Sequence, residues 1–215
     1  GLVAEARIHI GDHGFRVSAV DPGNVAMWQD VTLKPQAFEH FDSPGTAVVG
    51  VNLVKLLERF DTADGGDLVE FELDMESRML EVSYRTVTQR VALIDQEAIR
   101  DEPDDPDLDV PNTVVAEGRQ FSEMVNVADA LSDHVAVEAR PDAREVGFVV
   151  EGDVDTAEVV WSDEDVIDAD VTGEGHETIL SVEYLQELFA ELPADAEVTL
   201  HFGDEHPIRV MWETC

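Results

Sequence analysis

The residues that could carry chemistry in this chain are its carboxylates and its seven histidines. Eight Asp and Glu residues crowd the fifteen positions from Asp95 to Asp109, and such a cluster could hold a divalent cation or act in acid–base catalysis. Its stretch DEPDDPDLD, however, has neither the central glycine nor the terminal glutamate of a calcium-binding loop. We therefore predict no metal site there.

The histidines and the cysteine predict no catalytic centre either. No pair of histidines has the spacing of an HExxH site, and the chain contains no GxSxG turn, Walker loop or GxGxxG fingerprint. Cys215 is the only cysteine and the last residue, so neither a disulfide nor a cysteine metal site is expected. We predict no cofactor and no enzymatic activity. An enzyme whose carboxylate site is hidden among the many acidic residues is the alternative, and a buried, stoichiometric divalent ion would reveal it.

Charge is the strongest compositional signal. Lys and Arg total 13, Asp and Glu total 49, and the net charge is −36. Because 44% of the residues are hydrophobic, a disordered acidic chain is the poorer explanation. We predict a folded protein adapted to molar salt, where screening falls to about 3 Å and carboxylates hold water. No apolar run reaches the roughly 18–20 residues of a membrane helix, and a reducing cytoplasm is the expected location.

Two halves of the chain repeat one pattern, which predicts the elements that position any site. An offset of 129 residues superposes Leu56 on Leu185 and Phe60 on Phe189, and the alignment continues through a helix, a strand, a charged turn and a second strand. Three alternating strands precede the helix in each half. We therefore predict an α+β fold of two similar domains, each with many antiparallel strands and few helices.

The acidic, proline-containing stretch between the repeats predicts a connecting loop. We place the first domain at residues 1–94, the loop at 95–111 and the second domain at 112–215. The second half opens with a strand and a helix that have no counterpart in the first, and the first half closes with a strand that the second lacks. We expect that the natural protein has a further strand and helix before this chain and a further strand after it.

Each predicted helix has one apolar face suited to packing on a sheet. The first stripe is Leu53, Leu56, Leu57 and Phe60. On its opposite side Lys55 and Arg59 stand at i and i+4, two of the few cations in the chain. The outer faces of the other two helices carry no basic stripe, so their sequence does not predict DNA affinity.

The chain resembles the archaeal and eukaryotic sliding clamps, the family of proliferating cell nuclear antigen (PCNA). The resemblance is carried, in family order and spacing, by AVDPGNVAM, VNLVKLLERF, ALID, LSDHV and the stretch SVEYLQELFAELPADAEVTLHFGDEHPIRV. It implies a ring of three subunits with helices lining the hole. It also implies a processivity factor that encircles duplex DNA and tethers DNA polymerase, clamp loader, ligase and nuclease through short peptides.

The resemblance implies two further surfaces. Partner peptides would enter an apolar pocket beside the connecting loop, formed by Val20, Asn24, Val25, Met27, Leu108, Val110, Pro111 and Pro207. Ring closure would pair edge strands of neighbouring subunits, Gln89 to Ile94 with Ala157 to Trp161, with candidate side chains Val91, Leu93, Val159 and Trp161. Ordinary packing within a domain is the alternative for each of these apolar residues.

The sequence departs from the family where the hole should be basic. Positions that match the usual cations hold Glu123, Asn126 and Glu183, which leaves Lys55 and Arg59 as the DNA-channel candidates. Our hypothesis is that the closed ring holds DNA topologically, with salt cations and water between carboxylates and phosphates, because counterion release has little driving force in molar salt. A clamp-like subunit of a hetero-oligomeric ring is the alternative within this class.

Overall fold

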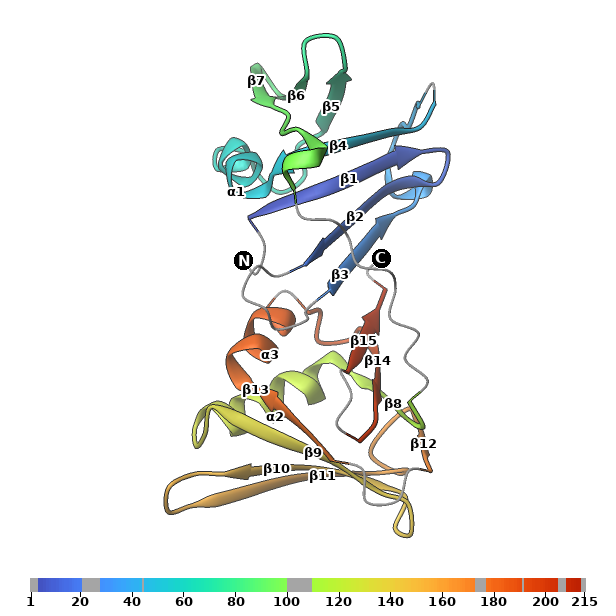
Figure 1. Cartoon of the computed structure of the whole chain (residues 1–215), viewed down its shortest axis with the longest axis vertical. Helices are drawn as coiled ribbons and strands as arrows, with labels where there is room; N and C mark the ends of the chain where they lie inside the picture. The colour runs from blue at the N-terminus through green and yellow to red at the C-terminus, as the bar shows by residue number, and fades with distance from the viewer. Residues whose placement is uncertain are drawn as a thin grey trace. The chain divides into compact units, whose positions relative to one another are not determined.

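The computed structural model of the chain describes residues 4–20, 28–43, 45–99, 110–172, 177–190, 192–204 and 208–213 (Figure 1). They form two compact units, which we call unit 1 (Gly1–Asp105) and unit 2 (Pro106–Cys215). The division falls inside the predicted connecting loop, eleven residues beyond the predicted end of the first domain. Each unit is described below by itself.

Unit 1 begins with an antiparallel sheet in the order β3-β2-β1-β4. Its strands are β1 (Glu5–Gly11), β2 (Gly14–Val20), β3 (Trp28–Leu33) and β4 (Ala47–Asn52). A tight turn joins β1 to β2, and Gly14 takes a φ of 99° there. A Cβ at Gly14 would lie 2.0 Å from the Leu33 carbonyl oxygen, so this turn requires glycine. A short 3-10 turn, η1 (Pro35–Ala37), follows β3.

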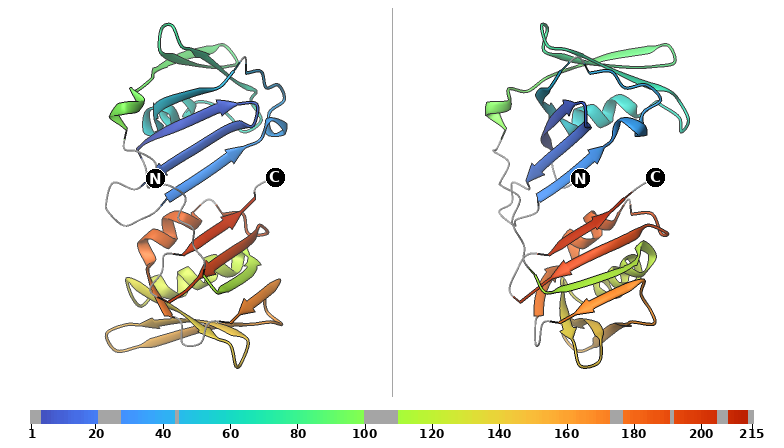
Figure 2. Two further views of the ribbon diagram at one scale, coloured as in Figure 1. Left: turned by 45° about the vertical axis from the view of Figure 1, so that its right-hand side comes forward. Right: turned by 90° about the vertical axis from the view of Figure 1, so that its right-hand side faces the viewer.

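A short helix joins this sheet to a second one. Helix α1 (Leu53–Leu57) starts at Asn52, whose side chain accepts a hydrogen bond from the Lys55 backbone N–H at 2.8 Å. It tightens at once into the 3-10 turn η2 (Glu58–Phe60). The second sheet then runs in the order β5-β6-β7, with β5 (Val69–Asp74), β6 (Met79–Tyr84) and β7 (Val87–Ala92), and the turn η3 (Gln96–Ala98) follows. Figure 2 shows both sheets of unit 1.

Unit 2 contains two four-stranded antiparallel sheets, in the orders β11-β10-β9-β13 and β12-β8-β14-β15. The strands of the first are β9 (His134–Arg140), β10 (Glu145–Glu151), β11 (Thr156–Ser162) and β13 (Glu177–Ser181). Those of the second are β8 (Asn112–Glu117), β12 (Asp168–Val171), β14 (Glu197–Phe202) and β15 (Arg209–Trp212). The strands expected in the two halves are present, and the structure adds three that alternation did not predict, β4, β12 and β13.

Two helices of unit 2 pack against each other and against its sheets (Figures 1 and 2). Helix α2 (Gly118–Asp129) begins where the Glu117 backbone N–H donates to the Gln120 side chain at 3.1 Å. Helix α3 (Val182–Phe189) follows β13 directly. None of the helices in the described parts of the chain has the length and apolarity needed to span a membrane.

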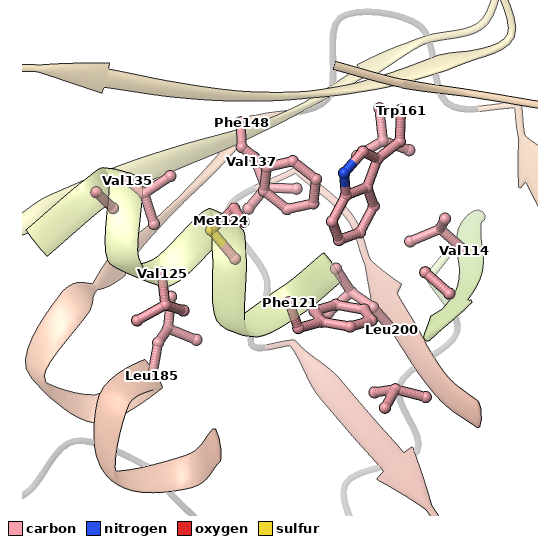
Figure 3. Packing of buried hydrophobic residues seen from close by; sticks show 14 of the residues in the cluster. Val114, Phe121, Met124, Val125, Val135, Val137, Phe148, Trp161, Leu185 and Leu200 are labelled. Atoms are coloured by element: carbon pink, nitrogen blue, oxygen red, sulfur yellow. The ribbon is translucent and has the colours of Figure 1, made fainter. Parts of the chain in front are cut away.

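The helices and sheets of unit 2 enclose its core (Figure 3). Phe121 is 1% exposed and meets Trp161 edge-on at 5.0 Å and Phe189 at 5.4 Å between ring centroids. Phe148 also meets the Trp161 ring edge-on, with 4.4 Å between the ring centroids. Because aromatic rings bury large apolar areas, these contacts make a tightly packed centre for unit 2.

The core of unit 1 is much smaller. Its buried cluster consists of Ile8, Val49 and Val51, with half-buried neighbours that include Leu56 and Leu73. The prediction of a continuous apolar face on the first helix is wrong at Leu57, which is 67% exposed. Helix α1 buries none of its residues, because no second helix packs on it among the described residues as α2 packs on α3.

Candidate functional site

The start of the connecting loop is held against the first sheet of unit 1. The Ile94 backbone N–H donates to the Gly50 carbonyl at 2.8 Å, and the guanidinium of Arg7 donates to the Ile99 carbonyl at 2.8 Å. The Ile99 side chain lies over Gly50, where a Cβ would come within 2.6 Å of Cδ1. Only a residue without a side chain lets the loop approach β4 so closely.

The end of the loop is held by unit 2. A Cβ on Gly203 would lie 3.1 Å from Cγ1 of Val110 and 3.3 Å from Cδ of Pro111, so both residues lie over this glycine. The Thr172 hydroxyl donates to the Pro111 carbonyl at 2.9 Å. Asn112, fully buried, receives a hydrogen bond from the Thr172 backbone N–H at 3.2 Å and donates to the Phe202 carbonyl at 3.3 Å.

These contacts fix where two residues of the predicted peptide pocket lie. Val110 is half-buried and Pro111 exposed, and both sit beside the residue that follows β14. Sequence reasoning missed Gly203, although a glycine between a buried strand and the predicted pocket residue Pro207 was a usable signal. Val20 ends β2, where its backbone pairs with Trp28. Its side chain is outside the described part of the structure, as are the whole of Asn24, Val25, Met27, Leu108 and Pro207.

The two candidate channel cations have different surroundings. Lys55 is exposed on α1. Arg59 lies beyond the end of α1, in η2, and its guanidinium reaches Gln89 Oε1 at 3.5 Å, while its Nε is buried with no hydrogen-bond partner among the described atoms. Arg59 is thus half-buried while Lys55 is exposed, and the placement of both in a DNA channel stays a prediction. The backbone carbonyl of Arg59 accepts hydrogen bonds from the Tyr84 hydroxyl and the Gln89 amide, both at 3.0 Å.

The outward faces of the unit 2 helices are acidic or neutral. Glu123, Asn126 and Asp129 are exposed on α2, and Glu183 and Glu187 are exposed on α3. None of these side chains carries a positive charge that could bind a DNA phosphate. The structure thus places at the surface the residues on which the hypothesis of salt-mediated DNA contact depends.

The candidate interface strands β7 and β11 are both outer strands of their sheets. Their apolar side chains, however, pack inside the unit to which they belong. Val91 is 3% and Trp161 is 5% exposed, and Leu93 and Val159 pack against the cores of units 1 and 2 respectively. What the two edges offer to another chain is their backbone hydrogen-bonding groups and the side chains that point outward.

The perturbed titratable groups have structural causes. Burial lowers the pKa of His201, and the positive charge of Arg209 lowers it further, while Nδ1 of the ring shares a hydrogen bond with the Thr113 hydroxyl at 2.9 Å. Hydrogen bonds from Ser162 lower the pKa of Asp165. The described residues contain no group of three or more His, Cys, Asp and Glu side chains that could hold a metal ion. None of these groups forms an acid–base pair.

Comparison with known proteins places the chain in a family. No family model matches it. It is 39% identical over 212 residues to the DNA polymerase sliding clamp of Natronomonas pharaonis, covering 99% of this chain and 84% of the relative. It is also 39% identical over 211 residues to the DNA polymerase sliding clamp of Haloarcula marismortui, covering 97% of this chain and 83% of that protein.

The fold agrees with the sequence. A solved structure described as the C-terminal region of FEN-1 bound to Archaeoglobus fulgidus PCNA superposes with a TM-score of 0.92 and 30% identity, covering 100% of this chain and 85% of that one. The chain belongs to the family of DNA polymerase sliding clamps, the processivity factors of DNA replication. The predicted family, its α+β clamp fold and its non-enzymatic character are thereby confirmed.

Proposed function

We propose that this chain assembles as a homotrimeric ring around duplex DNA in a high-salt cytoplasm. The proposal rests on family membership together with two outer strands, β7 and β11, whose backbone groups are available for pairing in the described structure. Light scattering behind a sizing column in about 2–3 M KCl, where exposed charges are screened, should give three times the mass of the chain. A stable single chain would instead favour a subunit of a hetero-oligomeric ring.

We further propose that polymerase, clamp loader, ligase and nuclease dock as short peptides beside the end of the connecting loop. The anchoring of Val110 and Pro111 over Gly203 supports this, because it holds apolar residues at a fixed place on the surface. A partner of this kind is known for a similar protein, since the solved structure of Archaeoglobus fulgidus PCNA contains the bound C-terminal region of FEN-1. The remaining pocket residues, from Val20 to Pro207, stay a prediction.

Fluorescence anisotropy of a labelled FEN-1 C-terminal peptide tests the pocket. Val110→Glu should weaken binding at least tenfold, because a charge beside an apolar anchor must be desolvated. Ile179→Glu is the matched control: it introduces the same charge at an apolar position of β13 that is 64% exposed, and should leave binding unchanged. Equal losses in both variants would contradict the placement of the pocket.

DNA contact is proposed to be topological, with salt cations and water bridging to the phosphates. The acidic helix faces of unit 2 support this. Retention on closed circular DNA should therefore fall only weakly between about 0.5 and 2 M KCl, because few counterions are released on binding. A steep loss of retention with rising salt would contradict the proposal, and so would a large loss for Lys55→Ala at constant salt.

A further inference from the structure

Three polar side chains of unit 2 form a row across the sheet β12-β8-β14-β15. Thr113 in β8 is paired with His201 in β14, and His201 is paired with Arg209 in β15. Directly paired residues of antiparallel strands lie on the same face of the sheet. The residues before and after Thr113 and His201 in the chain are buried: Asn112, Val114, Leu200 and Phe202. The row therefore lies on the face that points away from the core.

The row is a locally positive site in a strongly acidic protein. Burial and the positive charge of Arg209 lower the pKa of His201, although the chain as a whole has a net charge of −36. The Thr113 hydroxyl lies 2.9 Å from Nδ1 of the ring and orients it, so Nε2 is the ring nitrogen that can bind a ligand. All three residues are half-buried, and a charge-assisted hydrogen bond is stronger where it is partly removed from water.

Carboxylates surround this row on the same face. Asp170 is exposed on β12, where it pairs with Thr113 on the side away from His201. Asp204 is exposed just beyond the end of β14. Farther along this face are Glu117, Asp168 and Glu197. This distribution of negative charge repels a nucleic-acid backbone, which carries a phosphate at every nucleotide, but it tolerates one isolated anion at the row.

The row adjoins the place where the connecting loop is anchored. Pro111 and Gly203 each lie two positions from a member of the row, on the side toward the loop. Residues two apart on a strand are about 7 Å from each other. A partner peptide seated beside Val110 and Pro111 can therefore reach the row with a side chain about two positions from its apolar anchor.

We infer that Thr113, His201 and Arg209 form an anion subsite that binds one carboxylate side chain of a partner peptide. The inference rests on the proposed peptide pocket and adds a feature by which the clamp selects among peptides. A carboxylate there accepts charge-assisted hydrogen bonds from the Arg209 guanidinium and from Nε2 of His201, while Nδ1 keeps its hydrogen bond with the Thr113 hydroxyl.

The subsite gives peptide binding a pH dependence. A bound carboxylate offsets the positive charge of Arg209 and favours the imidazolium form of His201, so the pKa of His201 is higher in the complex than in the free protein. Affinity for a peptide with the carboxylate therefore rises as the pH falls through about 6.5, and the peptide carboxylate itself stays ionised down to about pH 4. A peptide with an amide at the same position lacks this dependence.

A scan of the FEN-1 C-terminal peptide tests the subsite. Each residue that flanks the apolar anchors of the peptide is replaced in turn by Asp and by Asn. Fluorescence anisotropy then gives the dissociation constant of each peptide in about 0.5 M KCl, where half-buried charges are only partly screened. At one position the Asp peptide should bind about tenfold more tightly than the Asn peptide at about pH 5.5, and about threefold more tightly at about pH 7.5.

Three variants of the protein assign this preference to the row. Arg209→Gln removes the charge and should bring the affinities of the Asp and Asn peptides close together at both pH values. His201→Gln keeps a polar side chain that does not titrate, and should abolish the pH dependence while a preference of about threefold remains. Arg144→Gln is the matched control and should change nothing. It removes an arginine that is 79% exposed and paired with Asp163, in the turn between β9 and β10 of the other sheet.

The outcomes separate the anion subsite from the pocket on which it depends. A peptide that does not bind, or whose binding is unaffected by Val110→Glu, overturns the pocket and the subsite with it. A peptide that needs Val110 but shows no preference for Asp, or a preference that survives Arg209→Gln, overturns the subsite alone. A duplex oligonucleotide whose binding is weakened as strongly by Arg209→Gln would make the row a phosphate site and overturn the peptide assignment. Unchanged affinity of Arg209→Gln for the Asn peptide shows that the variant is folded with its pocket intact.

Discussion

Units 1 and 2 repeat one arrangement of strands around a helix, yet their interiors differ. Phe71 in β5 and Leu200 in β14 are equivalent positions of the repeat, but Phe71 is 41% and Leu200 only 3% exposed. In unit 2, β14 has β8 on one side, and α2 covers the inner face. In the described part of unit 1, β5 is an outer strand with no such neighbour. A residue of the repeat is therefore buried only where a neighbouring strand and a covering helix are both present, whatever its sequence position.

The largest expected effect tests this contrast directly. Phe121→Ala should lower the free energy of unfolding of unit 2 by about 3–5 kcal/mol, because it empties the contact with Trp161 and Phe189. Phe71→Ala, at a half-open position, should cost about 1 kcal/mol or less. Denaturant titration in KCl, followed by tryptophan fluorescence and by hydrogen exchange resolved to each unit, measures both. Equal losses in the free energy of unfolding would show that the core of unit 1 is packed as tightly as that of unit 2.

A second test concerns what unit 1 uses in place of a large core. The Tyr84 hydroxyl, on a residue that is 3% exposed, lies 2.7 Å from the Thr62 hydroxyl and donates to the Arg59 carbonyl. Tyr84→Phe should destabilise unit 1 by about 1–2 kcal/mol, since it removes both the hydrogen bond to Thr62 and one of the two hydrogen bonds that the Arg59 carbonyl accepts. Ser83→Ala removes a hydroxyl from the neighbouring residue, which points the other way, and should stay within about 0.5 kcal/mol. Equal losses in the two variants would assign no special role to this network.

The smallest expected effect is a difference in pH dependence. Because the pKa of His201 is lower in the folded protein than its ordinary value near 6.5, the unfolded chain takes up this proton first. The stability of unit 2 should therefore fall as the pH drops from about 7 through 6.5 and below, until the folded form is also protonated. His201→Gln should flatten this part of the profile. The dependence of unit 1 over the same range, followed by hydrogen exchange, is the reference. An unchanged profile in the variant would reject the role of His201.

Much of the fold could be predicted from the sequence, because strand alternation and the repeat are local patterns. Alternation predicts strands over Ala6 to Ile10 and Val135 to Ala139, and β1 and β9 lie there. The exposure of individual side chains is harder to predict, because it depends on which other elements pack against them, and periodicity does not show that. Leu57 has helical spacing, but no second helix meets it among the described residues.

The candidate surfaces show the same limit. The sequence predicts Val91 and Trp161 as interface side chains because they are apolar residues of edge strands, but the structure buries both in their own units. Periodicity identifies which side chains share a face, but it cannot tell which face is covered. Gly203 and Gly147 were missed for a related reason, since the need for glycine arises from Val110 or Arg140 approaching from elsewhere in the fold.

The two anchors of the connecting loop have a consequence for how the molecule could be divided. Ile94 and Ile99 are tied to unit 1, and Val110 and Pro111 are tied to unit 2, so neither anchor depends on the other unit. A proteolytic cut between residues 100 and 109 would leave each half with its own end of the loop. The protein could then be studied as two separate fragments, each of which keeps the contacts that hold its own end of the loop.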